Sequence, residues 1–280
     1  MIARSFAGKA LIASTFARLD AARHEFVNRW KAPVRPPQPR GRVIEALLVL
    51  LVCLAVVDLF VALTWDAREA RWAATLSPAW LHIAEIVTRL GLSGYIFYLS
   101  ALIAALALLQ RGRGAGRVVD AGLGLLAGRA VFVFCDNMFS GIIGSQLIKH
   151  LVGRARPHLI DQVGPFHFEP FSFKSTLASF PSGHTITAFT TASALGLFAP
   201  KLRIPLYLLA SAVALSRLAL RAHYPSDVIA GAAIGLVSTW FVGRLFARRR
   251  IVFVACGAWF KARGRGMVGH ALGGLRLTQR

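Results

Sequence analysis

Acidic residues are scarce in this chain, and charge of either sign is below the level of a soluble protein. Twelve Asp and Glu stand against 33 Lys and Arg, which gives a formal net charge of +21. Charged residues make up 16% of the sequence, whereas a soluble domain has about 25%. The apolar residues, 56% of the total, are bunched into long runs. This composition argues against a soluble globular domain and indicates a membrane protein.

Cysteine is also rare, and the three present are Cys53, Cys135 and Cys256. Each lies in an apolar stretch, and none has a partner at a metal-ligand spacing, so we expect buried thiols without a disulfide framework. The N-terminus lacks both a long apolar core and a small-residue cleavage site, so we expect no cleaved signal peptide.

The excess of basic residues suggests nucleic acid as a partner, but the positions of these residues in the sequence argue against it. The Lys and Arg residues lie in tails and short loops beside apolar runs, which is typical of contact with anionic lipid headgroups. We therefore expect membrane lipids as partners and no nucleic acid. The sequence leaves the oligomeric state open.

Six apolar runs approach the length of about 20 residues that spans a bilayer. They predict an all-α, polytopic six-helix transmembrane bundle with both termini in the cytoplasm. Residues 1–42 form a basic tail with a candidate amphipathic helix, and 247–280 form a second basic tail in which the apolar segment 251–260 is too short to span. The expected spans, within a membrane domain of residues 43–246, are 43–65, 94–110 (extendable back to 90), 118–148, 184–200, 204–220 and 227–246.

This topology places 23 of the 33 Lys and Arg residues on the inside, as membrane proteins usually do. The outer segments 149–183 and 221–226 nevertheless contain several cations, and a concentrated anion site would explain them. Those cations, with one near the outer end of the fifth helix, are Lys149, Arg154, Arg156, Lys174, Arg221 and Arg217.

Two charges, Arg129 and Asp136, fall inside the third expected span. Charged groups are costly in a membrane and normally face protein or water. They are seven residues apart and so share a helix face, but at two turns they are too distant to pair. We expect each to be hydrogen-bonded inside the bundle.

Three segments at outer helix ends carry residues suited to phosphate chemistry. They read KHLVGRARP at 149–157, PSGH at 181–184, and SRLALRAHYPSD at 216–227. Lys149, Arg156 and Arg217 supply three cations for phosphate oxygens. Ser182 is a candidate N-cap, whose helix offers free backbone N–H groups to an anion, and Gly183 allows close backbone approach.

These segments resemble the K-x6-RP, PSGH and SR-x5-H-x3-D signature of the type 2 phosphatidic acid phosphatase superfamily, which also contains vanadium haloperoxidases. All eleven fixed positions match in order, and the resemblance covers about residues 45–246. It implies that His223 attacks phosphorus and becomes phosphohistidine, that Asp227 orients and stabilises its imidazole, and that His184 protonates the leaving oxygen and then activates water. It implies no metal and no cofactor, and the outer carboxylates show no ligand-type spacing.

Other residues near the motifs keep simpler interpretations. His150, His158 and His167 are expected to be structural, and contact with substrate is the alternative for His150 and His158, which flank the first motif. Arg154 and Arg221 occupy variable motif positions, where each either meets lipid or binds a second phosphate or headgroup. Four aromatic residues form an apolar stretch in the second outer segment: Phe166, Phe168, Phe171 and Phe173. This stretch is suited either to an anchor at the membrane interface or to part of the entrance through which a lipid reaches the site.

The sequence therefore predicts an integral membrane lipid phosphatase of the inner (plasma) membrane, with its site facing the periplasm or exterior. Undecaprenyl pyrophosphate and lipid A phosphate rank ahead of phosphatidylglycerol phosphate and phosphatidic acid, because the basic motifs favour a multiply charged headgroup. A lipid-to-lipid phosphotransferase would use the same site. A haloperoxidase is disfavoured by the spanning helices, and a phosphate-binding carrier or channel by the intact histidines and the lack of internal repeats.

Overall fold

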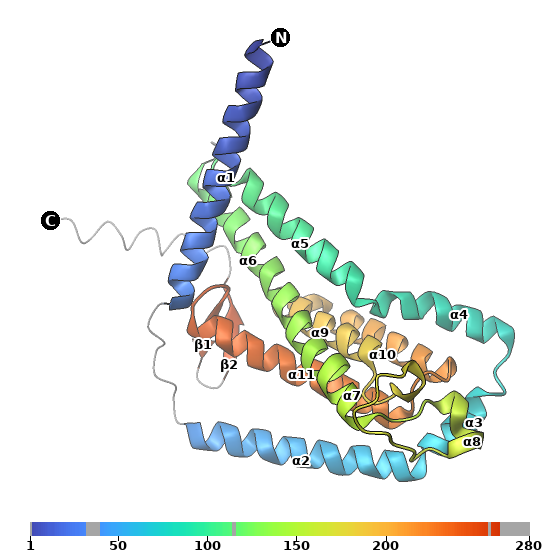
Figure 1. Cartoon of the computed structure of the whole chain (residues 1–280). Helices are drawn as coiled ribbons and strands as arrows, with labels where there is room; N and C mark the ends of the chain where they lie inside the picture. Colours follow the sequence, from blue (N-terminus) through green and yellow to red (C-terminus); the bar gives the residue numbers. More distant parts are fainter. Residues whose placement is uncertain (1, 32–39, 114–115, 257–258, 264–280) are drawn as a thin grey trace. The chain divides into compact units, whose positions relative to one another are not determined.

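The computed structural model describes residues 2–31, 40–113, 116–256 and 259–263 (Figure 1). The Pro-rich stretch 32–39 and most of the expected C-terminal tail lie outside these residues. By internal contacts the chain divides into two compact units, whose boundaries fall inside three helices. Unit 1 comprises Met1–Gln38, Tyr98–Phe134 and Gly243–Arg280, and unit 2 comprises Pro39–Phe97 and Cys135–Val242.

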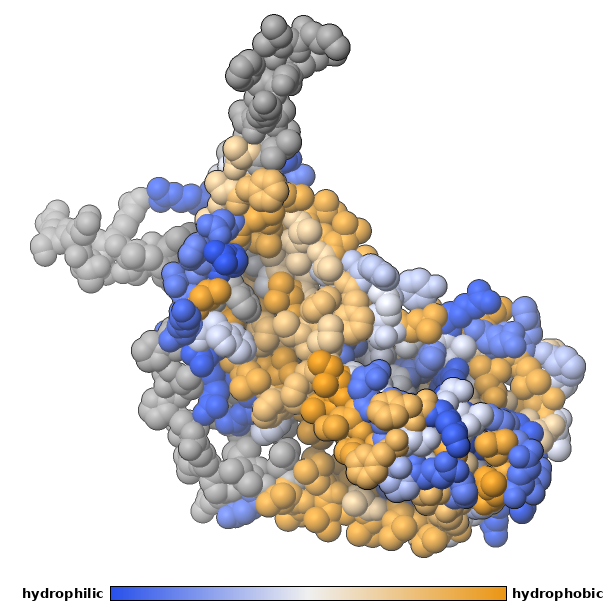
Figure 2. Space-filling view, in the orientation of Figure 1, coloured by the Kyte–Doolittle hydropathy of each residue, from blue (hydrophilic) through white to orange (hydrophobic). Residues whose placement is uncertain are grey.

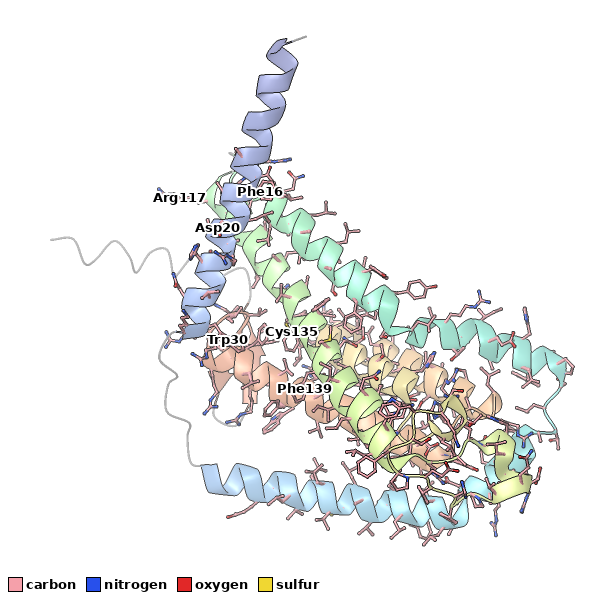
Figure 3. All side chains as sticks on the ribbon, viewed as in Figure 1. Phe16, Asp20, Trp30, Arg117, Cys135 and Phe139 are labelled. Carbon is pink, nitrogen blue, oxygen red and sulfur yellow. The ribbon has the colours of Figure 1, made fainter. Side chains whose placement is uncertain are left out.

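Unit 1 contains the helix α1 (Ile2–Lys31), which accounts for most of the tail expected at 1–42. It also contains most of α5 (Ser93–Gln110) and of α6 (Arg117–Ser140), and the end of α11 (Pro225–Arg248). The side chains of α1 include Trp30 (Figure 3), whose ring centroid lies 6.2 Å from that of Phe246. Phe132 packs edge-on against both Phe246 and Phe253.

The apolar segment 251–260 is not helical. It contributes to an antiparallel hairpin of β1 (Phe253–Cys256) and β2 (Trp259–Ala262), in which Phe253 pairs with Ala262. This hairpin is the exception to the all-α prediction among the described residues. The following residue, Arg263, offers its carbonyl oxygen to Arg129 Nη2 at 2.9 Å. The intramembrane arginine is thus hydrogen-bonded, but to the segment after the hairpin and not to another helix of the expected bundle.

Unit 2 holds the remaining helices. Here α9 packs against α10, and α10 packs against α4. Their bounds, with those of the shorter turns, are α2 (Arg40–Thr64), α3 (Asp66–Ala73), α4 (Pro78–Thr88), η1 (Arg89–Gly91), the π-helix η2 (Gly141–Ile148), α7 (Lys149–Val152), η3 (Pro157–Leu159), α8 (Ile160–Val163), η4 (Ser175–Leu177), α9 (Gly183–Phe198), η5 (Pro200–Leu202) and α10 (Arg203–Ala219).

Four helices in the described residues are long and apolar enough to cross a membrane, and a bent pair makes a fifth. They are Pro78–Gln110, Arg117–Val152, Pro200–Ala219 and Pro225–Arg248, with Leu48–Thr64 and Asp66–Ala73 meeting at 53°. The expected span at 184–200 is the 16-residue helix α9, just under the usual minimum of about 17 residues. The helical, multi-pass membrane architecture is confirmed, with the hairpin as an addition to it, and the number of six spans is not confirmed.

Apolar side chains cover the outer surface of unit 2 along α2, whereas polar side chains gather around α3 and α8 (Figure 2). On α2, Leu48, Val52 and Phe60 are all more than half exposed. A helix that turns large apolar residues outward is suited to lipid contact, because the bilayer and not water surrounds it.

The interior of unit 2 is partly polar, and hydrogen bonds between side chains satisfy its buried Asp136. Asp136 is fully buried and accepts hydrogen bonds from Ser238 Oγ at 2.6 Å and Thr239 Oγ1 at 2.7 Å. The second intramembrane charge is therefore bonded inside the helix assembly, as expected. Close by in sequence, Phe139 stacks on Phe241 with centroids 5.2 Å apart (Figure 3).

Gly153 ends α7, the short helix that contains the first residues of the first motif. Its φ of +60° is left-handed, and its N–H donates to Lys149 O at 3.0 Å, which is a common way to end a helix. A Cβ at this position would lie 1.7 Å from the main-chain oxygen of Glu169. Only glycine fits here, and the turn it makes directs the chain from Lys149 back toward Arg156.

Gly153→Ala should therefore destabilise the protein, because both the positive φ and the backbone clash oppose a side chain. We expect a loss of about 2 kcal/mol or more, and a fall in the unfolding temperature in detergent of at least about 5 °C. Gly122→Ala, in α6, is the matched control, since nothing lies within 4 Å of the added carbon. Equal unfolding temperatures for both variants would contradict this account.

Candidate active site

The three motifs lie in unit 2 at the ends of helices. Lys149 begins α7, and Arg156 lies in the loop that follows it. Ser182 and Gly183 stand at the start of α9. Arg217 lies in the last turn of α10, and Asp227 in the first turn of α11, with His223 between them.

One loop, residues 175–179, connects the motifs through its main-chain oxygens. Arg156 Nε donates to Ser175 O at 2.8 Å, and Lys149 Nζ donates to Ala178 O at 3.0 Å. Nδ1 of His223 lies 2.6 Å from Ser179 O. The first and third motifs are thus fixed on the same short segment, immediately before the second motif.

The second motif is bonded directly to the third, since Ser182 N donates to Asp227 O at 3.0 Å. Ser182 is the N-cap residue of α9, as predicted, but its hydroxyl accepts from Thr185 Oγ1 at 2.9 Å and makes no capping bond. A Cβ on Gly183 would lie 2.9 Å from Ser145 Oγ. The close backbone approach expected of Gly183 is therefore toward a neighbouring helix.

Positive charge is concentrated around His184. Lys149, Arg156 and Arg217 all act on it electrostatically. Arg217 donates through Nη1 to Thr88 Oγ1 at 2.8 Å, and its buried Nε has no hydrogen-bond partner in the described part of the chain. Three cations this close repel one another, and a bound anion offsets that repulsion.

His223 is buried, and its hydrogen bond determines its tautomer. A carbonyl oxygen can only accept, so Nδ1 carries the proton toward Ser179 O and Nε2 keeps its lone pair. Burial lowers the pKa of His223 from 6.5 to about 3, although Asp227 acts in the opposite direction. The imidazole is therefore neutral at ordinary pH and has a free nucleophilic nitrogen.

Asp227 reaches His223 largely through Ser179. Its Oδ2 accepts from Ser179 Oγ at 2.5 Å and from Tyr224 N at 2.8 Å, but lies 3.8 Å from His223 Nδ1. The resemblance implied a carboxylate that orients the imidazole directly. In this structure the carbonyl of Ser179 orients the ring, and the hydroxyl of the same serine bonds the carboxylate.

Arg154 is a site residue whose place the sequence did not reveal. Only 3% of its side chain is exposed, so it meets neither lipid nor a headgroup. Its Nη1 donates to Asp227 Oδ1 at 2.7 Å, and its Nη2 donates to Asp66 Oδ2 at 2.8 Å. The ring of Tyr224 lies beneath its guanidinium at 4.2 Å. The interpretation of Arg154 as a lipid or headgroup contact is therefore wrong.

Asp66 completes this cluster from the start of α3. It is fully buried, and it accepts from Ser226 N at 3.0 Å and from Ser226 Oγ at 2.5 Å. These residues are 160 positions apart in the chain, so no local pattern signals the contact. The variable motif residue Arg221 has a positive φ of 49° and donates to Pro157 O at 3.3 Å.

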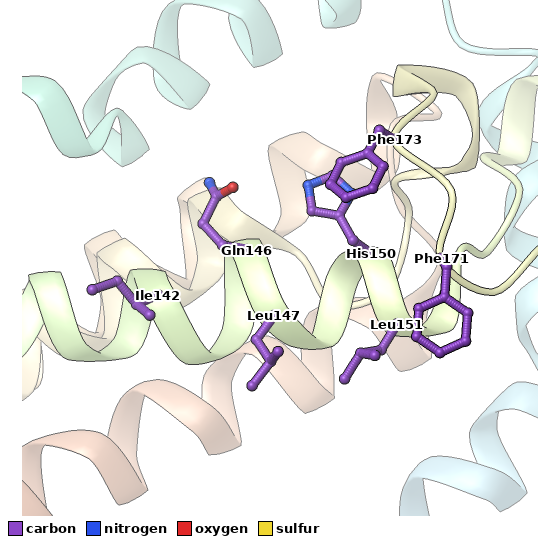
Figure 4. Close-up of a pocket in the computed structure, with 7 residues that line it drawn as sticks. All are labelled: Ile142, Gln146, Leu147, His150, Leu151, Phe171 and Phe173. Carbon is purple, nitrogen blue, oxygen red and sulfur yellow. The ribbon is translucent and has the colours of Figure 1, made fainter.

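The neighbouring histidines have structural contacts. His150 Nδ1 lies 2.9 Å from Ser172 O, and its ring stacks on Phe173. His150 also lines an apolar groove of about 400 Å³ beside the exposed phenylalanines (Figure 4). His167 pairs with Glu169 at 3.2 Å. Within the described residues, no group of three or more His, Cys, Asp or Glu side chains is arranged to hold a metal ion.

Comparison with known proteins identifies the family. The model of the PAP2 superfamily matches residues 125–251, which include all three motifs. Lipid A 1-phosphatase of Rhizobium johnstonii is 35% identical over 215 residues, which are 75% of this chain and 83% of the relative. Lipid A 1-phosphatase of Rhizobium etli is 33% identical over 215 residues, which are 75% and 87% of the two chains.

A solved structure, that of the transmembrane PAP2-type phosphatidylglycerolphosphate phosphatase from Bacillus subtilis, matches with a TM-score of 0.45 and 21% identity, over 72% of this chain and 94% of that one. The family model and the two relatives define the class as multi-pass membrane phosphatases. The chain belongs to the PAP2 superfamily, and it is a membrane lipid phosphatase.

Ser179→Ala tests the indirect contact between Asp227 and His223. The variant keeps the carbonyl for His223 but removes the hydroxyl donor to a buried carboxylate, and such bonds contribute about 1.5–3 kcal/mol. We expect phosphatase kcat to fall at least about tenfold with KM nearly unchanged. Ser172→Ala, in the preceding segment of the same loop, is the control, since it retains its carbonyl contact with His150. Equal kcat for the two variants would argue against this contact.

Proposed function

We propose that this phosphatase removes the 1-phosphate of lipid A. The proposal rests on the two lipid A 1-phosphatases that align with three quarters of the chain. A headgroup with several negative charges also complements the three cations around His184.

The observation that carries the reaction is the unprotonated Nε2 of His223 beside these cations. In the first step Nε2 attacks phosphorus, a nitrogen–phosphorus bond forms, and the bond to the lipid oxygen breaks. The negative charge of the bound phosphate favours the protonated form of His184, which donates its proton to that oxygen as it leaves. Lys149, Arg156 and Arg217, with the backbone N–H group of Gly183 in the first turn of α9, stabilise the phosphoryl oxygens.

In the second step water attacks the phosphohistidine, and His184 accepts the proton of that water. The nitrogen–phosphorus bond breaks, inorganic phosphate leaves, and His223 returns to its neutral form. Between the steps the phosphorylated imidazole carries a positive charge, which the carboxylate of Asp227 stabilises. The cations supply the charge stabilisation that a metal gives in other phosphatases.

We further propose that the site faces the periplasm or exterior side of the inner membrane. The basic tails 1–42 and 247–280, which precede and follow the membrane domain 43–246 in the sequence, would then both lie in the cytoplasm. The exposed phenylalanines, Phe171 at 73% and Phe173 at 80%, would meet the headgroup region beside the site.

Phosphate release by the detergent-purified protein tests the reaction. The substrates are lipid A, undecaprenyl pyrophosphate, phosphatidylglycerol phosphate and phosphatidic acid, each with EDTA present. We expect release from lipid A, with a product mass and fragmentation that locate the loss at the 1-position. His223→Ala should lose about 10⁴-fold or more in kcat, whereas His167→Ala, which removes only an exposed pair with Glu169, should be unaffected. Release only from another lipid would reject lipid A, and transfer to an added lipid would indicate a phosphotransferase.

Trapping the covalent intermediate separates the roles of the two histidines. Lipid labelled with ³²P in the hydrolysed phosphate should label the protein at His223, and His223→Ala should take up no label. His184→Ala removes the base that activates water, so labelled protein should persist longer than in the wild type. Label in His223→Ala would assign the nucleophile to another residue.

A further inference from the structure

The cluster formed by Asp66, Arg154 and Asp227 is the most fully buried set of charges in the described residues. Asp66 and Asp227 have no exposed surface, and Arg154 has 3%. Desolvating three charges is costly, and such groups persist only when geometry and hydrogen bonds compensate. Here both carboxylates are fully engaged, so the arrangement is specific.

Arg154 fixes the two carboxylates relative to each other. Its two terminal nitrogens bond different carboxylates, at 2.7 and 2.8 Å, and both Nε and Nη2 also donate to Pro165 O. A planar guanidinium can make these bonds at once, whereas an ammonium acts as a point charge. Arg154 therefore holds Asp227 through Oδ1, while Ser179 bonds the other carboxylate oxygen, Oδ2.

Asp66 fixes the same assembly from α3. Its two oxygens bond the N–H and hydroxyl of Ser226, the residue immediately before Asp227. This N–H lies in the first turn of α11, where backbone donors have no partner within the helix. Asp66 thus caps α11 from a distant part of the chain. This cap fixes the position of Ser226 and therefore of Asp227, the next residue.

The cluster also has a definite charge. Two carboxylates and one guanidinium leave one net negative charge next to His223. The other charged groups that act on His223 are Lys149 from α7 and Arg217 from α10, both positive. When His223 takes the phosphoryl group it gains one positive charge, which the single net negative charge of the cluster offsets.

We propose that Asp66 and Arg154 are positioning residues, which hold Asp227 against Ser179 and set the net charge facing His223. The inference rests on the proposed reaction at His223. Arg154 bonds Asp227 directly and Asp66 bonds the adjacent Ser226, so both act through Asp227. Without Arg154 the cluster would carry two negative charges, and without Asp66 it would carry none.

Charge-altering variants test this role through the pH dependence of kcat/KM. Arg154→Met makes the cluster more negative, which favours protonated His223. Since the attacking imidazole must be neutral, the acid limb should move to higher pH by about one unit. Asp66→Asn/Arg154→Met restores one net negative charge, and its acid limb should return to the wild-type position. The double variant also removes the uncompensated buried charge, so it should fold at least as well as Arg154→Met.

Asp66→Asn alone should lower kcat about tenfold, with KM changed less than twofold. It preserves an oxygen for Ser226 N while removing the negative charge that offsets phosphorylated His223. Arg154→Lys, which conserves the charge but not the double contact, should keep the wild-type acid limb with an intermediate kcat. All rates are taken per mole of monodisperse protein in detergent.

Each outcome has one meaning. If the acid limb is in the same place in wild type, Arg154→Met and the double variant, the cluster is merely structural and the inference is wrong. It is also wrong if kcat per folded molecule is unchanged in Asp66→Asn. A wild-type protein that releases no phosphate from any lipid contradicts the proposed function instead.

Discussion

The contact of one guanidinium with two buried carboxylates joins the parts of the site. Through Arg154 the loop after α7 is bonded to the start of α3 and to the first turn of α11. Residues far apart in the chain thereby acquire fixed positions next to His223. In an apolar surrounding, charges of this kind are stable only as a set, because removing one leaves the others unpaired. The geometry of the motifs is therefore supported by residues outside their fixed positions.

The sequence predicts the part of the site that depends on short spacings. His223 and Asp227 are four residues apart within the third motif, and the expectation that they act together comes from the resemblance of that motif to the family signature. The fold class and the family are likewise predictable, from apolar runs and from the motifs that bear the chemistry. By contrast, Ser179 contributes through both its carbonyl and its hydroxyl. Every residue type has a main-chain carbonyl, so the sequence could not indicate the contact of the Ser179 carbonyl with His223.

Long-range pairing and irregular helices limit prediction in a different way. In the sequence, Asp66 is an ordinary carboxylate after an apolar run. Only the folded structure shows that it bonds the start of α11. Hydropathy predicts a third span over 118–148, but it does not distinguish α6 from the π-helix η2 that follows. Hydropathy also gives no sign that α9 is a 16-residue helix with buried Thr185 and Thr190. The hairpin after α11 was missed because a short apolar run fits several structures.

The separation of Asp66 from Asp227 has a consequence for how the protein is made. A ribosome delivers helices in order, so Asp66 and Arg154 are synthesised before the first turn of α11, to which both are bonded. The site lacks its nucleophile at that stage, since His223 and the first turn of α11 belong to the last part of the membrane domain. A chain that stops early is therefore an inert fragment. The membrane receives phosphatase activity only when the final helix has been inserted.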